Sequence, residues 1–422
     1  MMCRGAPPAR PYICYTGVSM ETFLPISQAL DALRCGRFVI VTDDEGRENE
    51  GDLVMAAEHV TADAMAFIIR HTGGVVCMPL SGAIADQLRL PPMVERNTSR
   101  LGTPFTISID AAAGITTGIS AADRASTVRT AINPVAKPED LRHPGHVFPL
   151  RAQDGGVLVR AGHTEAAVDL CRLSGLREGA LISELMNDDG TMMRLPQLQE
   201  FSQQHDIPMI SIADLIAWRC RHETLVRKEA ESDLETDTGL WRIAVYRDTL
   251  HSRDHVALIK GTFTALQPVL VRVHSECLTG DAFHSQQCDC GGQLQIAMQR
   301  IAEEGAGVLL YLRQEGRGIG LIDKIRAYAV QQREGLDTVQ AQERLGLPVD
   351  LRTYGIGAQI LKDVGVGNLR LLTNNPKKII GLQGYGLHVV DQLPIEISPS
   401  SGHQKKYLRT KKEKLGHMLS NM

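Results

Sequence analysis

Short apolar runs alternate with segments of helical periodicity along most of this chain, and this alternation constrains the fold more than any other feature. Residues 38–41 and 75–78 have the unbroken apolar character of buried strands. They alternate with helical patterns at residues 26–33 and 64–70. The pattern predicts mixed β-sheets layered with helices, which is an α/β (mixed α+β) fold.

The alternation stops near the middle of the chain and then resumes. After residue 240 it continues with strand-like runs at 269–273 and 308–312. An acidic stretch of weak apolar character, residues 229–237, lies between the two blocks, and this shift in composition predicts a boundary near residues 222–238. Because 422 residues exceed what one ordinary core organises, we expect two domains, at residues 20–222 and 223–422.

Composition and charge exclude several classes of protein. Hydrophobic residues make up 43% of the chain and charged residues 22%, which is globular composition. A formal net charge of -4 and the lack of a basic and aromatic stripe argue against nucleic-acid binding. No apolar stretch approaches the roughly 18 residues that span a bilayer. The cysteines accompany no export signal, so we expect a cytoplasmic protein that has no disulfides and binds no membrane.

A dense run of charged residues, 43–52, directly follows the first strand-like run. Carboxylates crowded into one turn repel one another unless a cation or solvent offsets their charge. Hard oxygen ligands beside a strand end suit Mg²⁺, and Arg47 offers a forked donor to a phosphate or hydroxyl. A solvated acidic turn explains this run equally well.

A second motif, residues 160–165, places a histidine between an arginine and a threonine. Gly162 permits close approach of the backbone, and Arg160 and Thr164 can hold an anion. His163 can ligate a metal or move a proton, although a lone histidine is more often structural. Two further motifs, at residues 144–150 and 184–191, identify no reaction by themselves.

Taken together, and with residues 120–124 and 128–129, these motifs resemble the 3,4-dihydroxy-2-butanone 4-phosphate synthase family over residues 26–222. That family converts D-ribulose 5-phosphate to L-3,4-dihydroxy-2-butanone 4-phosphate and formate. The resemblance implies two Mg²⁺ (or Mn²⁺) ions bound by Glu48 and His163, and catalytic roles for His146 and Glu184. The residues that it implies contact the sugar phosphate are Arg47, Glu48, Asp52, Arg160, Ala161, Gly162, His163, Thr164 and Glu184.

Three cysteines in the second half, Cys277, Cys288 and Cys290, form a C-x10-C-x-C pattern that two glycines follow. Three thiolates leave a fourth position open, as a catalytic zinc site requires, whereas a structural site is normally closed by a fourth ligand. Three buried thiols without a metal are the alternative. Downstream, residues 314–320 follow an apolar run and open a helix, where backbone N–H groups and Arg317 can receive phosphate.

These features, with residues 272–276, 350–352 and 373–378, resemble GTP cyclohydrolase II over residues 242–393. That family converts GTP to 2,5-diamino-6-(ribosylamino)-4(3H)-pyrimidinone 5'-phosphate, formate and pyrophosphate. The resemblance implies one Zn²⁺ on the three cysteines, Asp350 as proton acceptor, Arg352 as the nucleophile toward phosphorus, and Tyr328 as a catalytic residue near the purine. The residues that it implies bind GTP are Arg272, Val273, His274, Ser275, Glu276, Gln293, Glu315, Gly316, Arg317, Thr338, Thr373 and Lys378.

The leading hypothesis is therefore a bifunctional enzyme of riboflavin biosynthesis that acts on ribulose 5-phosphate and GTP. Three departures from the family pattern, at Gln287, at Thr353 and in the length between Tyr328 and Thr338, support an alternative. In that alternative only the N-terminal lyase is active, and the C-terminal half is a GTP-binding or scaffold domain. A zinc-stabilised nucleic-acid-binding protein is a second alternative, which the negative net charge disfavours. The resemblance implies homodimers for both domains.

Overall fold

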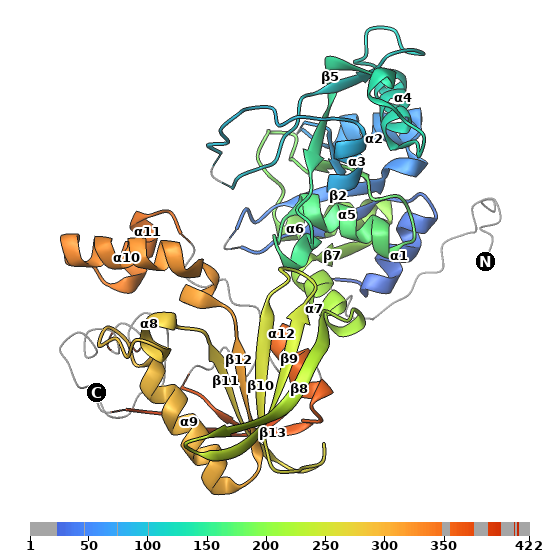
Figure 1. Ribbon diagram of the computed structural model, residues 1–422. Helices are drawn as coiled ribbons and strands as arrows, with labels where there is room; N and C mark the ends of the chain where they lie inside the picture. The colour runs from blue at the N-terminus through green and yellow to red at the C-terminus, as the bar shows by residue number, and fades with distance from the viewer. Residues whose placement is uncertain are drawn as a thin grey trace. The chain divides into compact units, whose positions relative to one another are not determined.

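The computed structural model describes residues 23–45, 47–73, 75–99, 101–347, 355–374 and 387–397, with Arg409 and Lys412. The chain divides into two compact units, residues 1–219 and 220–422. Within the described residues, each unit contains a seven-stranded mixed sheet with helices packed on it (Figure 1). The predicted fold class is confirmed.

The sheet of the first unit has strand order β4-β5-β3-β6-β2-β1-β7 and mixes parallel with antiparallel neighbours. Its helices pack in two groups, because successive strand side chains point to opposite faces. Ile40 and Leu53 belong to one core, while Val39, Val41 and Val54 belong to the other. The strands are β1 (Val39–Thr42), β2 (Gly51–Ala56), β3 (Cys77–Leu80), β4 (Ile109–Ala111), β5 (Leu141–Arg151), β6 (Ala180–Glu184) and β7 (Met209–Ser211).

Two groups of helices cover these cores. Side chains of α2 (Ala62–His71), α3 (Gly82–Gln87), α4 (Ala121–Ile132) and α6 (Leu195–His205) enter the first core. Side chains of α1 (Ile26–Arg34), α5 (His163–Leu173) and α7 (Ile212–His222) enter the second. The expected strand at 75–78 is misplaced by two residues, because Val75 is exposed and the ladder with β5 begins only at Cys77.

The sheet of the second unit has strand order β14-β13-β11-β12-β10-β9-β8. Strands β11, β12, β13 and β14 run parallel, so their carboxyl ends share one edge of the sheet. Helix α12 (Gly355–Asp363) packs on one face and α9 (Cys290–Glu304) on the other. The strands are β8 (Val226–Thr236), β9 (Gly239–Asp248), β10 (Asp254–Lys260), β11 (Val269–Ser275), β12 (Gly307–Leu312), β13 (Asn368–Leu372) and β14 (His388–Leu393).

The acidic stretch at residues 229–237 is not a linker, because most of its residues belong to β8, and the two units divide at residues 219 and 220. This strand pairs antiparallel with β9 along its whole length. It lies at the edge of the sheet, and almost all its side chains are exposed, so its sequence has no apolar period. Charged side chains are the usual composition of an edge strand that must not pair with other chains.

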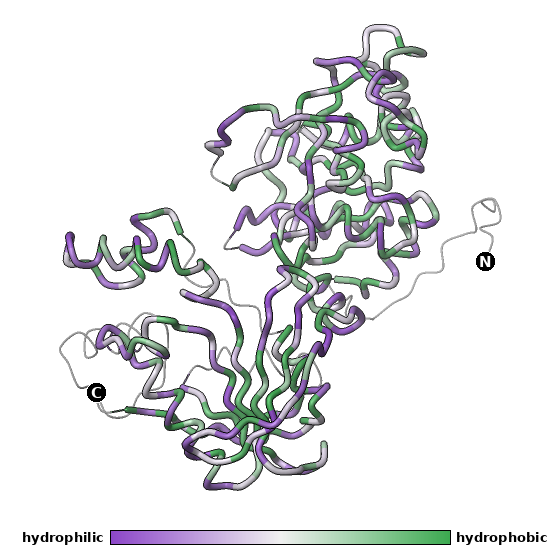
Figure 2. The backbone as a smooth tube through the Cα atoms, viewed as in Figure 1, coloured by the Kyte–Doolittle hydropathy of each residue, from purple (hydrophilic) through white to green (hydrophobic). Residues whose placement is uncertain are grey.

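Hydrophobic residues concentrate along the strands of both sheets (Figure 2). In the described part of the chain, no helix is long and apolar enough to cross a membrane.

A fragment of residues 20–222 is expected to fold by itself, because the end of α7 is anchored in the first unit. Arg219 donates to the carbonyl oxygen of Gly155 at 2.7 Å and to the carboxylate of Asp169 at 2.8 Å, and both ionic side chains are 4% exposed. Arg219→Met in this fragment removes the closest cation from the buried carboxylate of Asp169, and breaking a buried ion pair from one side costs about 3–5 kcal/mol. Urea unfolding measures the free energy of unfolding of the parent fragment and of its Arg219→Met variant. An insoluble parent fragment, or equal stability of the two, contradicts the expected division of the chain.

Candidate active sites

The charged run after β1 forms a turn that Asp43 organises. Its carboxylate accepts hydrogen bonds from the backbone N–H groups of Glu48 at 3.0 Å and Glu50 at 2.8 Å, and from Arg47 at 2.9 Å. Arg47 also contacts the carboxylate of Glu48. Because the side chain of Asp43 is only 1% exposed, protein donors rather than solvent offset its charge.

His163, the first residue of α5, lies against this turn. Its Nδ1 is 3.6 Å from Oε2 of Glu48 and 3.8 Å from Oδ1 of Asp52. Asp43, Glu48 and His163 offer potential ligand atoms that all lie within 4.8 Å of one another. Oδ1 of Asp52 and Nε2 of His163 are buried without a hydrogen-bond partner, which is unusual unless an ion or a substrate supplies one. The cluster therefore suits a divalent cation with oxygen and imidazole ligands.

The groups in this cluster perturb one another strongly. Burial raises the pKa of Asp52 to about 7. Burial alone would lower the pKa of His163, but the carboxylates of Asp52 and Glu48 outweigh it and raise that pKa to about 9. The neighbouring imidazole in turn lowers the pKa of Glu48 against the effect of its burial. A divalent cation bound here would displace the imidazole proton, because a ligating histidine is neutral.

Two more predicted residues flank the cluster. Glu184 at the end of β6 is the direct partner of Asp52 in the β2–β6 ladder, and Thr164 follows His163 in the buried first turn of α5. Arg160 precedes Ala161 and the N-cap Gly162, and it donates to the fully buried carboxylate of Glu165 at 2.6 Å. The ladder and the start of α5 thus bring these motifs together.

His146 is held separately. It lies on β5, where its Nδ1 is 2.8 Å from Oδ2 of Asp110 and its backbone N–H donates to Oδ1 of Asp110. Within the described ranges, no hydrogen bond or ion pair joins it to the Glu48–His163 cluster. The neighbouring Gly145 has to be glycine, because a Cβ there would lie 2.0 Å from the backbone of Ile109.

The three cysteines of the second unit converge around the end of β11. Cys277 follows the strand, Cys290 begins α9, and Sγ of Cys277 lies 3.7 Å from Sγ of Cys288. All three sulfur atoms lie within 4.8 Å of one another. Two thiolates on one tetrahedral Zn²⁺ at about 2.3 Å each would lie about 3.8 Å apart. A Cβ at Gly280 would come within 2.8 Å of Sγ of Cys288, so glycine leaves room for the sulfurs. The arrangement fits one zinc ion.

The close sulfurs divide their charge unevenly. The pKa of Cys277 is lowered, because the other two thiols and then Lys324 stabilise its thiolate. The same contacts raise the pKa of Cys288 to about 11 and also raise that of Cys290. Zn²⁺ would allow all three to ionise.

Asp281 supports the first cysteine from α8 (Leu278–Asp281). It accepts from the backbone N–H of Cys277 at 2.9 Å and from the hydroxyl of Tyr311 at 2.8 Å. It also lies 3.1 Å from Nε2 of His274, whose ring stacks on that of Tyr311. These contacts hold the backbone in place just after β11, where Cys277 lies.

Predicted GTP-binding residues follow three parallel strands at their carboxyl ends, where ligands of open α/β sheets usually bind. Glu315 and Gly316 lie in η4 (Glu315–Gly318) after β12, and Thr373 follows β13. Arg272 on β11 is buried and donates to Gln293 on α9 at 2.7 Å, and Gln293 donates to Asp289. The remaining described members are Val273, Ser275 and Glu276 around the end of β11 and Thr338 on α11 (Thr338–Arg344), and the predicted catalytic residue Tyr328 lies on α10 (Gly320–Glu334).

Several predicted residues lie outside the described residues. They are Asp350, Arg352, Lys378 and the side chain of Arg317, together with Thr353 among the departures. A second of the three departures, Gln287, lies in the loop before Cys288, where its backbone N–H donates to the hydroxyl of Ser285.

Sequence reasoning missed the residues that hold these groups in place. Asp110 orients His146, Glu165 pairs with Arg160, Asp281 supports Cys277, and the buried Lys324 donates to Cys277. A buried charge is the structural signal that these residues share, but the sequence alone does not reveal burial.

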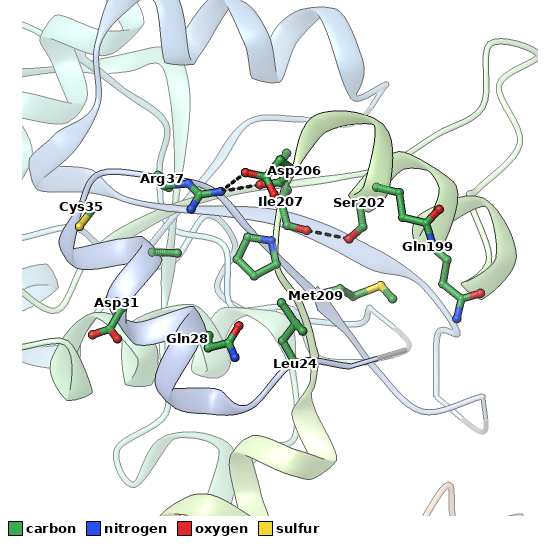
Figure 3. A pocket seen from close by; sticks show the side chains of 13 residues that line it. Leu24, Gln28, Asp31, Cys35, Arg37, Gln199, Ser202, Asp206, Ile207 and Met209 are labelled. Carbon is green, nitrogen blue, oxygen red and sulfur yellow. Dashed lines mark hydrogen bonds and ion pairs between the residues drawn. The ribbon is translucent and has the colours of Figure 1, made fainter. Parts of the chain in front are cut away.

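A cavity of about 660 Å³ in the first unit contains none of the predicted site residues. It lies between α1 and α6, and an ion pair between Arg37 and Asp206 spans part of it at 2.9 Å (Figure 3).

Comparison with known proteins identifies the family. The family model of 3,4-dihydroxy-2-butanone 4-phosphate synthase matches residues 27–218, and that of GTP cyclohydrolase II matches residues 227–394. The riboflavin biosynthesis protein RibBA of Bacillus cereus is 55% identical over 398 residues, which are 94% of this chain and 100% of that protein. The chain belongs to the RibBA family. RibBA of Bacillus cytotoxicus is also 55% identical, with the same coverage of 94% and 100%.

A solved structure shares the two-domain fold. RibBX of A. baumannii, described as a two-domain 3,4-dihydroxy-2-butanone 4-phosphate synthase, is 35% identical with a TM-score of 0.69, and the match covers 89% of this chain and 100% of that one. As a RibBA protein, this chain combines a synthase (lyase) and a GTP cyclohydrolase II (hydrolase) for riboflavin biosynthesis. Its small-molecule substrates are ribulose 5-phosphate and GTP. The bifunctional hypothesis is confirmed over the single-activity alternative.

Proposed function

We propose that the Glu48–Asp52–His163 cluster is the active site of the lyase, with two Mg²⁺ or Mn²⁺ ions bound through Glu48 and His163. The orphaned buried atoms of Asp52 and His163 are the observation that carries this assignment. Bound Mg²⁺ supplies an electrophile for the ketone of ribulose 5-phosphate. Glu184, the partner of Asp52 in the ladder, is assigned as the base that takes the proton next to that carbonyl.

The other predicted residues bind and orient this substrate. Arg47 and Thr164 offer donors to its hydroxyl and phosphate oxygens, and the backbone at Ala161 and Gly162 allows close approach. Arg160 adds positive charge, although Glu165 holds its guanidinium in place. His146 moves a proton, and Asp110 fixes which ring nitrogen carries it.

We propose that the cysteine cluster is the active site of the cyclohydrolase and binds one Zn²⁺. The 3.7 Å separation of Cys277 and Cys288 carries this assignment. Zn²⁺ held there would supply a Lewis acid that lowers the pKa of a water molecule far enough to make it a nucleophile near neutral pH. The GTP-binding residues predicted at the ends of β11, β12 and β13 surround the same edge of the sheet, with Tyr328 beside the purine.

The transfer at phosphorus is assigned to two residues outside the described ranges. Arg352 attacks the guanylyl phosphorus as pyrophosphate leaves, and Asp350 accepts the guanidinium proton. That base is chemically necessary, because an arginine side chain has a pKa above about 12. Lys378 and Arg317 offset the phosphate charge.

Both domains are proposed to form homodimers. Ile322 and Ile325 on α10 are 70% and 45% exposed, which supports a covered surface on the second unit. Sedimentation equilibrium of the full chain measures the assembly, and a monomer at all concentrations contradicts it.

The two activities are expected to depend on different metal ions, the lyase on Mg²⁺ or Mn²⁺ and the cyclohydrolase on Zn²⁺. Formate release from ribulose 5-phosphate should stop when EDTA removes Mg²⁺ and return with added Mg²⁺ or Mn²⁺. Formate release from GTP should depend on about one tightly bound zinc per chain and return with Zn²⁺ after its removal. A formate assay with each substrate, paired with metal analysis, tests this. Lyase activity without any divalent cation, or cyclohydrolase activity without zinc, contradicts the proposed sites.

A further inference from the structure

Lys324 on α10 is a buried cation that makes direct contact with a cysteine of the cluster. It is 7% exposed, and its ammonium donates to Sγ of Cys277 at 3.2 Å, to Oγ1 of Thr279 at 2.9 Å and to Oε1 of Glu315 at 2.8 Å. An ammonium has three N–H donors, so these three contacts use all of them. A buried charge is tolerated when it is paired and fully hydrogen-bonded, as this one is.

Neighbouring side chains that are themselves held in place determine where the ammonium of Lys324 points. Glu315 accepts from the backbone N–H of Leu278 at 2.7 Å and from that of Gly316 at 2.8 Å, so its carboxylate is tied to both sides of the site. The ring of Tyr328, one turn along α10, lies 5.7 Å from Nζ of Lys324. The side chain is therefore directed at the sulfur of Cys277.

We propose that Lys324 is a positioning residue that tunes the zinc centre through the sulfur of Cys277. This inference rests on the proposed zinc site. Three thiolates around Zn²⁺ leave one net negative charge, and the ammonium neutralises it. A hydrogen bond to a thiolate also withdraws electron density from that sulfur, so Cys277 donates less to the metal and the metal is a stronger Lewis acid. Lys324 thus raises both zinc affinity at neutral pH and electrophilicity at the open position.

If Lys324 had only a structural role, its replacement would have different experimental effects. In that case the ion pair with Glu315 would anchor α10, and its loss would affect stability without changing the electronic state of the sulfur. Co²⁺ bound in place of Zn²⁺ separates the two roles, because its thiolate-to-metal charge-transfer absorption reports electron donation by sulfur. Loss of the hydrogen bond to the sulfur makes electron donation from sulfur to the metal easier, and it therefore moves this absorption band to longer wavelength.

The test compares Lys324→Met with the full-length wild type. Arg326→Met is the matched control, because it removes an exposed cation from the same helix. Lys324→Met is expected to bind Zn²⁺ about 10–100-fold more weakly in competition with a chromophoric chelator. Its Co²⁺ charge-transfer band should move to longer wavelength, and its kcat for formate release from GTP should fall more than its KM changes. Lys324→Arg should restore part of the zinc affinity, and Arg326→Met should match the wild type.

Lys324→Gln is also neutral but retains an N–H donor for Glu315, and it provides the same readouts if the methionine variant unfolds. The inference is overturned if the folded neutral variant keeps wild-type zinc affinity and band position. Both readouts are taken without GTP, so they stand even if the chain releases no formate from GTP. A wild-type chain that binds no zinc would instead overturn the proposed site itself.

Discussion

Glu48→Gln is expected to abolish formate release from ribulose 5-phosphate while formate release from GTP continues. Glu48 is the carboxylate that lies between Arg47 and His163, and it offers an oxygen to the proposed cation cluster. Its amide replacement removes the negative charge that a cation requires. Loss of outer-shell partners of a metal costs about 10–100-fold, so loss of this ligand should cost about 100-fold or more. Formate dehydrogenase coupled to each reaction measures both rates.

Glu45→Gln is the matched control for this prediction. It removes one negative charge from the same turn, but its side chain is exposed and it takes no part in the cluster. It should retain near-normal lyase activity. Near-normal lyase activity in both Glu48→Gln and His163→Ala would show that this cluster is not the active site of the lyase.

Cys288→Ser is expected to lose zinc and formate release from GTP while the lyase keeps its rate. Serine is a poor zinc ligand at neutral pH, because its hydroxyl stays protonated where a thiol can ionise. With two thiolates left, zinc content should fall from about one per chain toward zero, and formate release should fall by about 100-fold or more. Metal analysis and the two formate assays measure these changes.

Two further variants serve as a control for cysteine loss and as a test of the separate phosphorus step. Cys35→Ser removes an exposed thiol from the other unit and should leave zinc content unchanged. Arg352→Ala should keep zinc and lose pyrophosphate release, since zinc and arginine are assigned to different steps. Full zinc content in Cys288→Ser, or pyrophosphate release at the normal rate in Arg352→Ala, would contradict these assignments.

Features that depend on local sequence could be predicted, whereas features that depend on tertiary contacts could not. Strands β11 and β12 were predictable, because buried parallel strands have near-continuous apolar sequences. Strand β8 was not, because it is stabilised by pairing with β9 and has no buried face. The strand expected at 75–78 was displaced, because the partner strand rather than hydrophobicity decides where a ladder begins.

The same distinction holds for the sites. The potential ligands Glu48, Cys277 and Cys288 occur in short motifs and were predictable as residues. Their supporting partners are distant in sequence: Asp110 lies 36 residues before His146, and Lys324 lies 47 residues after Cys277. Only the folded chain brings such pairs together, and burial then makes their charges consequential.

If one chain carries two independent active sites, the rate of formate release with both substrates present tests this most directly. Saturating ribulose 5-phosphate and GTP should together yield a rate equal to the sum of the two separate rates, since each substrate occupies its own site. A combined rate no higher than the faster separate rate would mean that the substrates compete for one site. Formate from only one substrate would mean that the other site is inactive, and either result would contradict two independent active sites.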